Sequence, residues 1–205
     1  MTMKLYYAPG ACSLNPHIVL REAGIPFDLD RVQLGPSKKT STGVDYVTVN
    51  PKGSVPALQL DNGEVLTEGA VIVQYLADQK PATKLAPAAG TMERYRLQEW
   101  LNYIASEIHK GFSPLFNPNA TDEAKEAIKK SLAPKFDFLA KRLSAHPYLT
   151  GDSFTVADSY LFTILNWKGH LKVDLSSWPS LVAYYDKIAK RPAVQAAMQA
   201  EGLLK

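Results

Sequence analysis

The chain has 205 residues, of which 46% are hydrophobic and 21% are charged, so it is long enough to bury a core and is not a disordered protein. Its net charge of +3 is too small for a typical nucleic-acid-binding protein. The single cysteine, Cys12, excludes an internal disulfide and a cysteine-based zinc cluster. We expect no metal, no membrane partner and a reducing, cytoplasmic location.

The first eighty residues alternate between strand and helix patterns. Residues 57–60 and 64–66 are short apolar runs around Asn62-Gly63, which is a strong hairpin signal. The other elements expected here are strands at 4–7 and 27–34 and helices at 14–23 and 70–78. In the helix at 70–78, the buried stripe is expected to be Val71, Ile72, Tyr75 and Leu76. This order predicts a small mixed sheet covered by helices.

After a proline-rich linker at 81–90 the strand patterns stop. Apolar residues then recur at helical spacing, which predicts helices over 92–112, 123–144, 155–168, 181–189 and 194–200. Thr155 and Asp158 match a capping box that has Asp in place of Glu. We therefore expect an α/β domain over 1–82 and an all-α domain over 91–205.

Cys12 is the first candidate for chemistry. It follows a strand and a Pro-Gly-Ala turn and stands just before a helix, where free backbone amides favour a thiolate and lower the thiol pKa. The alternative is a small buried hydrophobic residue, which is the commoner role of a lone cysteine. Position alone leaves these two interpretations about equal.

Two further candidates lie on either side of the predicted hairpin. A cis bond at Val55-Pro56 would expose the Val55 backbone to an extended ligand, although an ordinary trans turn is far commoner. The segment Thr67-Glu68-Gly69 precedes a helix, where backbone amides bind a carboxylate and Glu68 can take a ligand amine. The alternative for this segment is a plain helix cap.

The long helix of the second part carries a polar stripe. Asn102, Ser106 and His109 are spaced i, i+4 and i+7, and Ser113 extends the row. A solvated face is the ordinary explanation of such a stripe. Because it holds few charges and one histidine, a functional face is the alternative.

Five segments together resemble bacterial beta-class glutathione transferases over the whole chain. They are KLYYAPGACSLNPHIVLREAG, DYVTVNPKGSVPALQLDNG, LTEGAVIVQYLAD, WLNYIASEIHKGFSPLF and FTVADSYLF. The resemblance implies a thioredoxin-like domain followed by a helical domain. It also implies a symmetric homodimer, glutathione as co-substrate with no permanently bound cofactor, and a small hydrophobic electrophile or a disulfide as the second substrate.

The resemblance also implies roles for individual residues. Cys12 is expected beside the glutathione sulfur. The Ser13 hydroxyl and the His109 imidazole are further donors that favour the glutathione thiolate. The glutathione-binding residues it implies are Cys12, Lys38, Val55, Pro56, Glu68, Gly69, Asn102 and His109. Lys39 is an alternative to Lys38 at the glycyl carboxylate, Asn102 is expected to reach the partner subunit's glutathione, and many relatives have Ser where Gly69 stands.

The walls of the hydrophobic substrate pocket are expected in the second domain. The candidates are Tyr103, Lys110, Phe112, Phe116 and Trp167. The implied activity is conjugation of reduced glutathione to hydrophobic electrophiles in detoxification. Cys12 either takes no part in conjugation, or it supports thiol-disulfide or peroxidase chemistry by forming a mixed disulfide with glutathione. A non-catalytic protein that binds glutathione or hydrophobic ligands is the alternative from another class.

Overall fold

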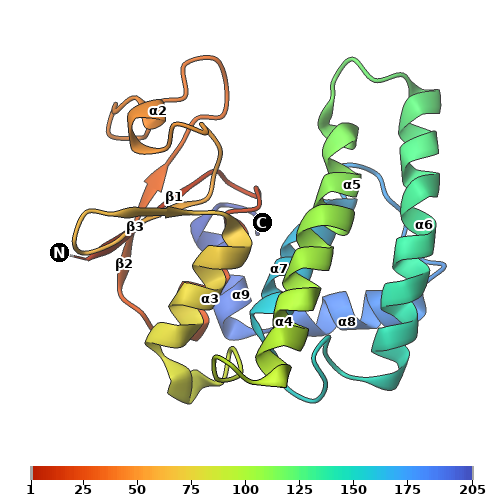
Figure 1. Cartoon of the computed structure of the whole chain (residues 1–205). Coiled ribbons are helices and arrows are strands. Elements are labelled where there is room, and N and C mark those ends of the chain that lie inside the picture. Colours follow the sequence, from red (N-terminus) through yellow and green to blue (C-terminus); the bar gives the residue numbers. More distant parts are fainter. Residues whose placement is uncertain (1, 205) are drawn as a thin grey trace. The chain divides into compact units, whose positions relative to one another are not determined.

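A computed structural model describes residues 2–204 and divides the chain into two compact units (Figure 1). The first unit is Met1–Ala86 together with Arg191–Lys205, and the second is Pro87–Lys190. The expected second domain, 91–205, therefore includes a C-terminal segment that packs with the first unit. No described helix is both long and apolar enough to cross a membrane.

The first unit is built on a four-stranded sheet of order β2-β1-β3-β4. Its strands are β1 (Met3–Tyr7), β2 (Phe27–Arg31), β3 (Ala57–Gln59) and β4 (Val65–Thr67). β1 pairs parallel to β2 and antiparallel to β3, and Leu5 faces Leu29 on one side and Leu58 on the other. The hairpin expected around Asn62-Gly63 is confirmed, because β3 and β4 pair antiparallel.

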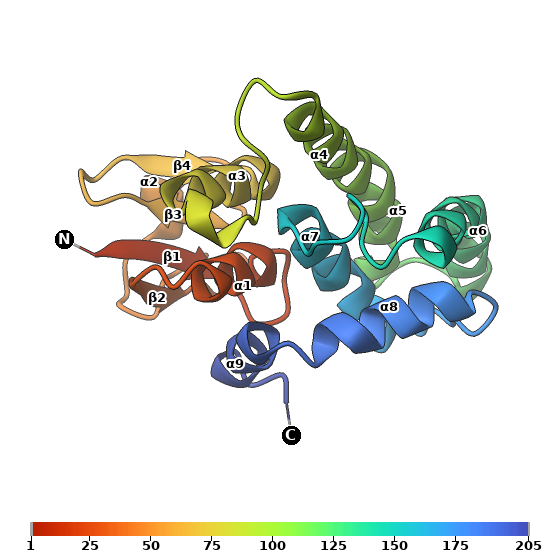
Figure 2. The ribbon, with the colours of Figure 1, turned by 90° about the horizontal axis from the view of Figure 1, so that it is seen from below.

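The longer helices of this unit are α1 (Leu14–Glu22), α3 (Gly69–Gln79) and α9 (Pro192–Ala200). α1 contacts both α3 and α9 (Figure 2), and all its residues from Leu14 to Leu20 are buried. α9 buries Val194, Ala197 and Met198, and this burial explains why the C-terminal segment belongs to the first unit. Arg191 also pairs with Glu22 at 2.6 Å.

One expectation for α3 is wrong. Val71 is 46% exposed, and the buried residues of α3 are Ile72, Val73, Leu76 and Ala77. The helix begins one residue earlier than expected. Its buried face includes Ile72 and Val73, and Val71 lies outside that face. An apolar side chain is thus left on the surface of the first unit.

A short helix, α2 (Tyr46–Val49), lies between the predicted strand at 27–34 and the predicted hairpin, where we predict no element. Asp45 caps it by accepting a hydrogen bond from the Val47 amide at 3.1 Å. Tyr46 is fully buried in a cluster with Tyr6 and Val55. A four-residue helix has no measurable periodicity, so the sequence pattern does not reveal it.

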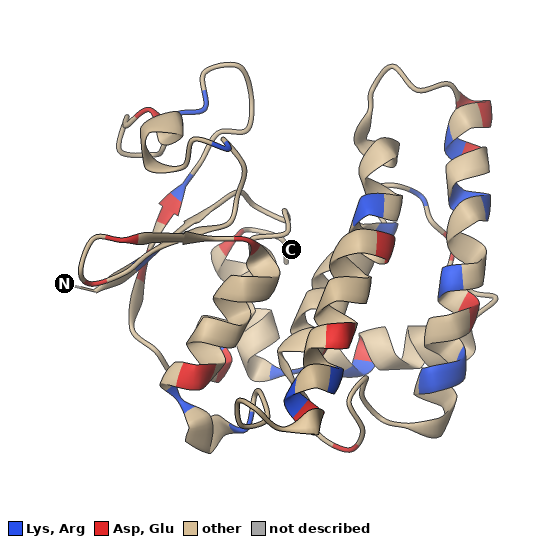
Figure 3. Cartoon of the chain, in the orientation of Figure 1, with Lys and Arg blue, Asp and Glu red and all other residues tan. Residues whose placement is uncertain are grey.

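The second unit is helical. Beyond the linker helix η1 (Pro81–Thr83), its elements are α4 (Met92–Tyr103), η2 (Ile104–His109), α5 (Lys110–Phe112), η3 (Ser113–Phe116), α6 (Asp122–Ala145), α7 (Val156–Leu165), η4 (Asn166–Lys168) and α8 (Pro179–Ala189). The single helix expected over 92–112 is interrupted by η2, which is π-helical. Charges of both signs are interspersed along α6 (Figure 3).

The core of the second unit is α7, whose ten residues are all buried. The expected capping box is confirmed: the Asp158 carboxylate accepts hydrogen bonds from the Thr155 amide at 2.8 Å and the Leu149 amide at 2.9 Å. The Tyr184 hydroxyl donates to the same carboxylate at 2.9 Å. Asp158 therefore ties the start of α7 to the preceding loop and to α8.

Candidate functional site

Cys12 lies on the turn between β1 and α1, two residues before the helix begins. Ser13 holds this turn, because its hydroxyl accepts from the Ala8 amide at 3.1 Å and donates to the Ala8 carbonyl at 3.2 Å. Ser13 is fully buried and does not cap α1 with its side chain. Because its one proton is used on Ala8, the structure gives Ser13 a positioning role instead of the expected role as a donor to a thiolate.

The Cys12 thiol is in contact with the segment before β3. Its Sγ donates to the Val55 carbonyl oxygen over 3.1 Å. The Val55-Pro56 peptide bond is cis, as the ligand-binding interpretation of this dipeptide required. The Cys12 side chain is therefore tied to the backbone of the cis-proline segment.

Two side chains fix the backbone just before Val55. The Ser54 carbonyl accepts from the Tyr46 hydroxyl at 2.8 Å and from the Asn50 amide group at 2.7 Å. Burial raises the pKa of Tyr46 to about 12, so its hydroxyl stays protonated and remains a donor. This support holds the Val55 backbone in place beside Cys12.

Glu68 occupies the N-terminal end of α3 with an unusual backbone. Its φ of 67° lies in the left-handed region, which non-glycine residues rarely adopt and which is frequent at functional sites. Its carboxylate pairs with the Lys52 ammonium at 2.6 Å, and Lys52 also donates to the Thr67 hydroxyl at 3.0 Å. Both side chains of the ion pair are more than half exposed, so a ligand amine has access to the carboxylate.

Gly69 follows at the first position of α3 and packs beside Pro56. A Cβ placed on Gly69 would lie 3.6 Å from Pro56 Cγ, which is an ordinary van der Waals distance. The site therefore has space for a small side chain here, although this chain has none. The backbone amide of Gly69 is left as the group that can meet a carboxylate.

Of the two candidate lysines, Lys38 is the one near this segment. It is half-buried, and its ammonium lies against Gly53, two residues before Val55. The Lys38 carbonyl accepts from the Tyr46 amide at 2.8 Å. Lys39 is exposed and its backbone pairs with Asp45. The first unit thus gathers a thiol, a cis-proline backbone segment, a carboxylate and an ammonium group.

In the second unit, His109 ends the π-helical turn and is largely buried. Its Nδ1 is 2.8 Å from the Tyr160 hydroxyl, and its ring meets that of Trp167 with centroids 5.1 Å apart. Burial, followed by the neighbouring charge of Lys110, lowers the pKa of His109 to about 4. His109 is therefore uncharged at neutral pH, with Nε2 left for another partner.

The five residues expected to line the substrate pocket do not form one group. Phe116 and Trp167 pack edge to face at 5.0 Å, and fully buried Phe112 lies against Trp167 at 6.2 Å. Tyr103 packs instead on Trp100 and Phe138. Lys110 and Asn102 are exposed. An aromatic wall of Phe116 and Trp167 next to His109 remains, and Tyr103 belongs elsewhere.

The sequence reasoning missed three residues of the site: Tyr46, Asn50 and Lys52. Tyr46 and Asn50 bond to the Ser54 carbonyl, and Lys52 bonds to Glu68. All three lie between β2 and β3, shortly before Val55. No periodicity or motif there indicates which distant residues these three contact. Their nearness in sequence to Val55-Pro56 is the one feature that hints at a role in the site.

A thioredoxin-like unit with a cysteine facing a cis-proline segment, joined to a helical unit, defines a class of thiol-binding proteins. Two family models match the chain: "Glutathione S-transferase, N-terminal domain" over residues 10–79 and "Glutathione S-transferase, C-terminal domain" over residues 103–192. The chain belongs to the glutathione S-transferase family. Transferase activity with glutathione as co-substrate, rather than binding alone, is the function that its close relatives support.

Individual relatives are similar to this chain along almost its full length. Glutathione S-transferase GstA of Escherichia coli O157:H7 is 47% identical, covering 98% of this chain and all of the relative. The structure of a sphingomonad glutathione S-transferase complexed with glutathione is 50% identical with a TM-score of 0.93. A beta-class enzyme of Sphingomonas chungbukensis is 51% identical with a TM-score of 0.94. Each structure covers 98% of this chain and is itself covered completely.

Proposed function

We propose that glutathione lies extended along the first unit, with its cysteinyl backbone paired to Val55 and its sulfur beside Cys12. The observation that carries this proposal is the 3.1 Å contact between Cys12 Sγ and the Val55 carbonyl. It joins the thiol and the ligand-pairing backbone in one place. In the same proposal the γ-glutamyl end meets Glu68 and Gly69, and the glycyl carboxylate meets Lys38.

The proposed reaction is conjugation, with Cys12 as a hydrogen-bond donor. When the glutathione amide donates to the Val55 carbonyl in place of Cys12, the Cys12 thiol donates its proton to the glutathione sulfur. This hydrogen bond favours the glutathione thiolate. That thiolate forms a bond to an electrophilic carbon, the carbon–halogen bond of an aryl halide breaks, and the halide leaves with the electron pair. The thiol proton of glutathione passes to solvent.

His109 is the second proposed donor. Its lowered pKa keeps the ring neutral, so it offers one N–H and one lone pair. If the Tyr160 hydroxyl donates to Nδ1, the ring proton resides on Nε2 and can be donated to a substrate group. Phe116 and Trp167 supply apolar walls for the electrophile.

The competing reaction uses Cys12 as a redox centre. A Cys12 thiolate would attack the glutathione sulfur of a mixed disulfide between glutathione and a substrate thiol, release that thiol and form a Cys12–glutathione disulfide. A glutathione thiolate would then attack the glutathione sulfur of this disulfide, leave as glutathione disulfide and restore the Cys12 thiolate. Cys12→Ser and Cys12→Ala separate the two reactions, because serine keeps a donor and neither variant forms a disulfide. We expect Cys12→Ser to conjugate an aryl halide faster than Cys12→Ala, and both to lose disulfide reduction.

Thiolate ultraviolet absorbance of bound glutathione, titrated with pH, provides a direct readout. In Cys12→Ala the pKa of bound glutathione should be higher than in the Cys12→Ser protein. Equal conjugation rates in Cys12→Ala and Cys12→Ser contradict the donor role, and full retention of disulfide reduction in Cys12→Ala contradicts the redox role. Failure of isothermal calorimetry to detect glutathione binding by the unmodified protein overturns the placement itself.

A homodimer is part of this proposal. Its support is apolar surface: Val71 on α3 is 46% exposed, and Met92 and Tyr95 on α4 are 65% and 56% exposed. A second copy that covers these faces would also bring Asn102 to the partner's glutathione. Light scattering coupled to gel filtration should give twice the chain mass, and Tyr95→Glu should lower it. We further propose a cytoplasmic detoxification role.

A further inference from the structure

His109 is the last residue of a stretch whose helical winding differs from that of its neighbours. η2 is π-helical over Ile104–His109, and it joins α4 before it to α5 after it. π-Helical turns are rare and occur frequently at functional sites. Because the phase of a helix sets the direction of each of its side chains, a contact that fixes η2 also fixes the direction of the His109 ring.

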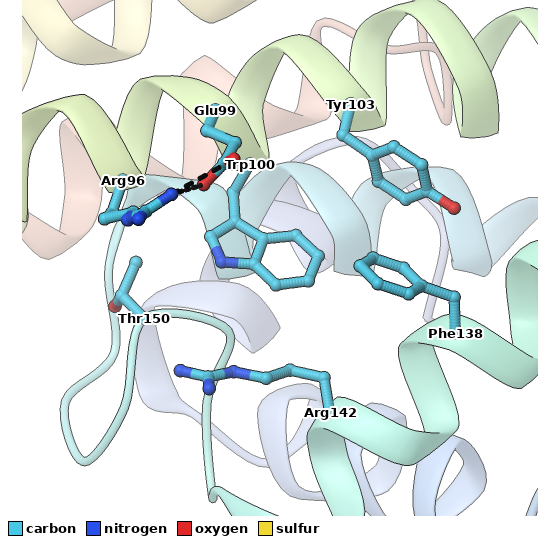
Figure 4. Close-up of a pocket in the computed structure, with 7 residues that line it drawn as sticks. All are labelled: Arg96, Glu99, Trp100, Tyr103, Phe138, Arg142 and Thr150. Carbon is cyan, nitrogen blue, oxygen red and sulfur yellow. Dashed lines mark hydrogen bonds and ion pairs between the residues drawn. The ribbon is translucent and has the colours of Figure 1, made fainter.

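Aromatic side chains fix the chain where it enters η2. Tyr103, the last residue of α4, meets Phe138 of α6 edge to face, with ring centroids 5.2 Å apart (Figure 4). Trp100 packs against the same Phe138 ring at 5.7 Å. The start of η2 is therefore held on α6, and its end depends on a different contact.

Lys135 of α6 holds η2 near its end. Its ammonium nitrogen donates to the Glu107 carbonyl oxygen at 2.9 Å and lies 2.9 Å from the Glu107 carboxylate. The same carbonyl accepts from the Lys110 amide, where the chain passes from η2 into α5. The Lys135 side chain is 27% exposed, so its charge is partly shielded from water and the hydrogen bond is stronger than one between fully exposed groups.

Gly111 lets α5 and α6 come close together beside this contact. A Cβ placed on Gly111 would lie 2.7 Å from Cδ2 of the fully buried Leu132 and 3.6 Å from the Lys135 ammonium nitrogen. The first distance is too short for a real Cβ, so a larger residue here would force Leu132 to move. This close packing brings the Lys135 side chain to the backbone of η2.

The His109 ring has fixed neighbours on α7 and η4. Its Nδ1 lies 2.8 Å from the Tyr160 hydroxyl, and its ring meets that of Trp167 at 5.1 Å. Tyr160 belongs to α7, whose residues are all buried, so it cannot readily follow a movement of His109. A rotation of η2 would therefore lengthen or break the hydrogen bond between His109 and Tyr160.

We propose that Lys135 is a positioning residue for His109. By holding the Glu107 carbonyl, Lys135 fixes the phase of η2 and keeps the His109 ring on the Tyr160 hydroxyl, with Nε2 available to a substrate group. The catalytic part of this inference rests on the proposed role of His109 as a donor. The position of the ring does not depend on that role, so the two can fail separately.

The test compares Lys135→Met with Lys129→Met. Lys129 lies on the same helix, has a side chain that is 23% exposed and pairs with Glu126 at 2.8 Å, so it is a matched control. The first readout is nitrogen-15 NMR of the histidine rings in the full protein at neutral pH, with His109→Gln to identify the His109 signals. We expect Lys135→Met to shift the His109 Nδ1 signal, because the hydrogen bond to Tyr160 changes, and to leave the other histidines in place. Lys129→Met should shift none of these signals.

The second readout is conjugation of an aryl halide. Lys135→Met should lower kcat about three- to ten-fold and change the KM for glutathione less than about two-fold. In the His109→Gln protein the same substitution should have no further effect on kcat, because both changes act through one ring. Lys135→Arg keeps a charged donor and should retain about half of kcat or more. Glu107→Gln removes the ion pair but leaves the carbonyl to Lys135, so both readouts should change less than in Lys135→Met.

The outcomes separate the positioning role from the donor role. Unchanged His109 signals in folded Lys135→Met overturn the proposal, as do additive losses of kcat in the double variant. A kcat that falls in His109→Gln but not in Lys135→Met overturns it too. Shifted signals with kcat unchanged in both variants support the positioning of the ring and overturn the donor role of His109. If Lys135→Met does not fold, Lys135→Gln, which is uncharged and shorter than lysine but keeps a polar end, takes its place with the same expectations.

Discussion

His17 and Glu201 form a fully buried pair, with Nδ1 of the imidazole 2.8 Å from the Glu201 carboxylate. Arg21 donates to the other imidazole nitrogen at 3.0 Å, so the ring proton resides on Nδ1 and is donated to Glu201. The second carboxylate oxygen accepts from the Gly10 amide at 2.9 Å. The end of the chain is thereby bonded to the turn that carries Cys12.

Replacing this carboxylate should be costly. In Glu201→Gln the new NH2 group would face a buried donor, either His17 Nδ1–H or the Gly10 amide, and neither can accept its hydrogen bond. We therefore expect a loss of about 2–4 kcal/mol in unfolding free energy. Denaturant unfolding measures it, and Glu64→Gln on the exposed hairpin is the control. A change below about 0.5 kcal/mol would show that the buried pair does not hold the C-terminal segment.

Asp158 should be the most sensitive position of the second unit. Asp158→Ala removes the carboxylate that accepts from the Leu149 amide, the Thr155 amide and the Tyr184 hydroxyl. We expect a loss of about 3–5 kcal/mol, measured by denaturant unfolding. Asp152→Ala, an exposed change six residues earlier, should cost little. Equal costs of the two substitutions would contradict the capping role of Asp158.

His109 makes stability depend on pH. Its pKa falls from 6.5 to about 4 on folding, so between these values the unfolded chain binds more protons than the folded one. Stability from this group is therefore complete above about pH 6.5 and declines as the pH falls toward 4, by up to about 3 kcal/mol. Unfolding measured from pH 4 to 8 should show a shallower decline in His109→Gln. Identical pH profiles for the two proteins would contradict the burial effect.

Gly69 offers a gain-of-affinity test. Since a Cβ there meets Pro56 only at 3.6 Å, Gly69→Ser should fold normally. Its hydroxyl should add a hydrogen bond to the γ-glutamyl carboxylate and lower the KM for glutathione about two- to ten-fold. Gly69→Ala supplies the Cβ without the hydroxyl and should leave KM unchanged. If both variants raise KM, the ligand approaches Gly69 too closely for any side chain.

Lys52 and Glu68 should respond unequally although they pair at 2.6 Å. Exposed ion pairs contribute little, so Lys52→Met should change the KM for glutathione less than about three-fold. Glu68→Gln removes the proposed partner of the ligand amine and should raise KM about ten-fold or more. Steady-state kinetics at varied glutathione concentration measures both. Equal effects would indicate that Glu68 acts only through Lys52.

The sequence by itself determined the class of each half of the chain, the hairpin around Asn62-Gly63, the capping box at Asp158 and the candidate thiol. These features depend on neighbouring residues, on periodicity or on similarity to a family. Only the tertiary structure decided that Ser13 bonds to Ala8, that Lys52 pairs with Glu68 and that α9 packs with the first unit. It also separated Tyr103 from Trp167. Such contacts join residues far apart along the chain or set one rotamer among several, and local sequence carries no signal for either.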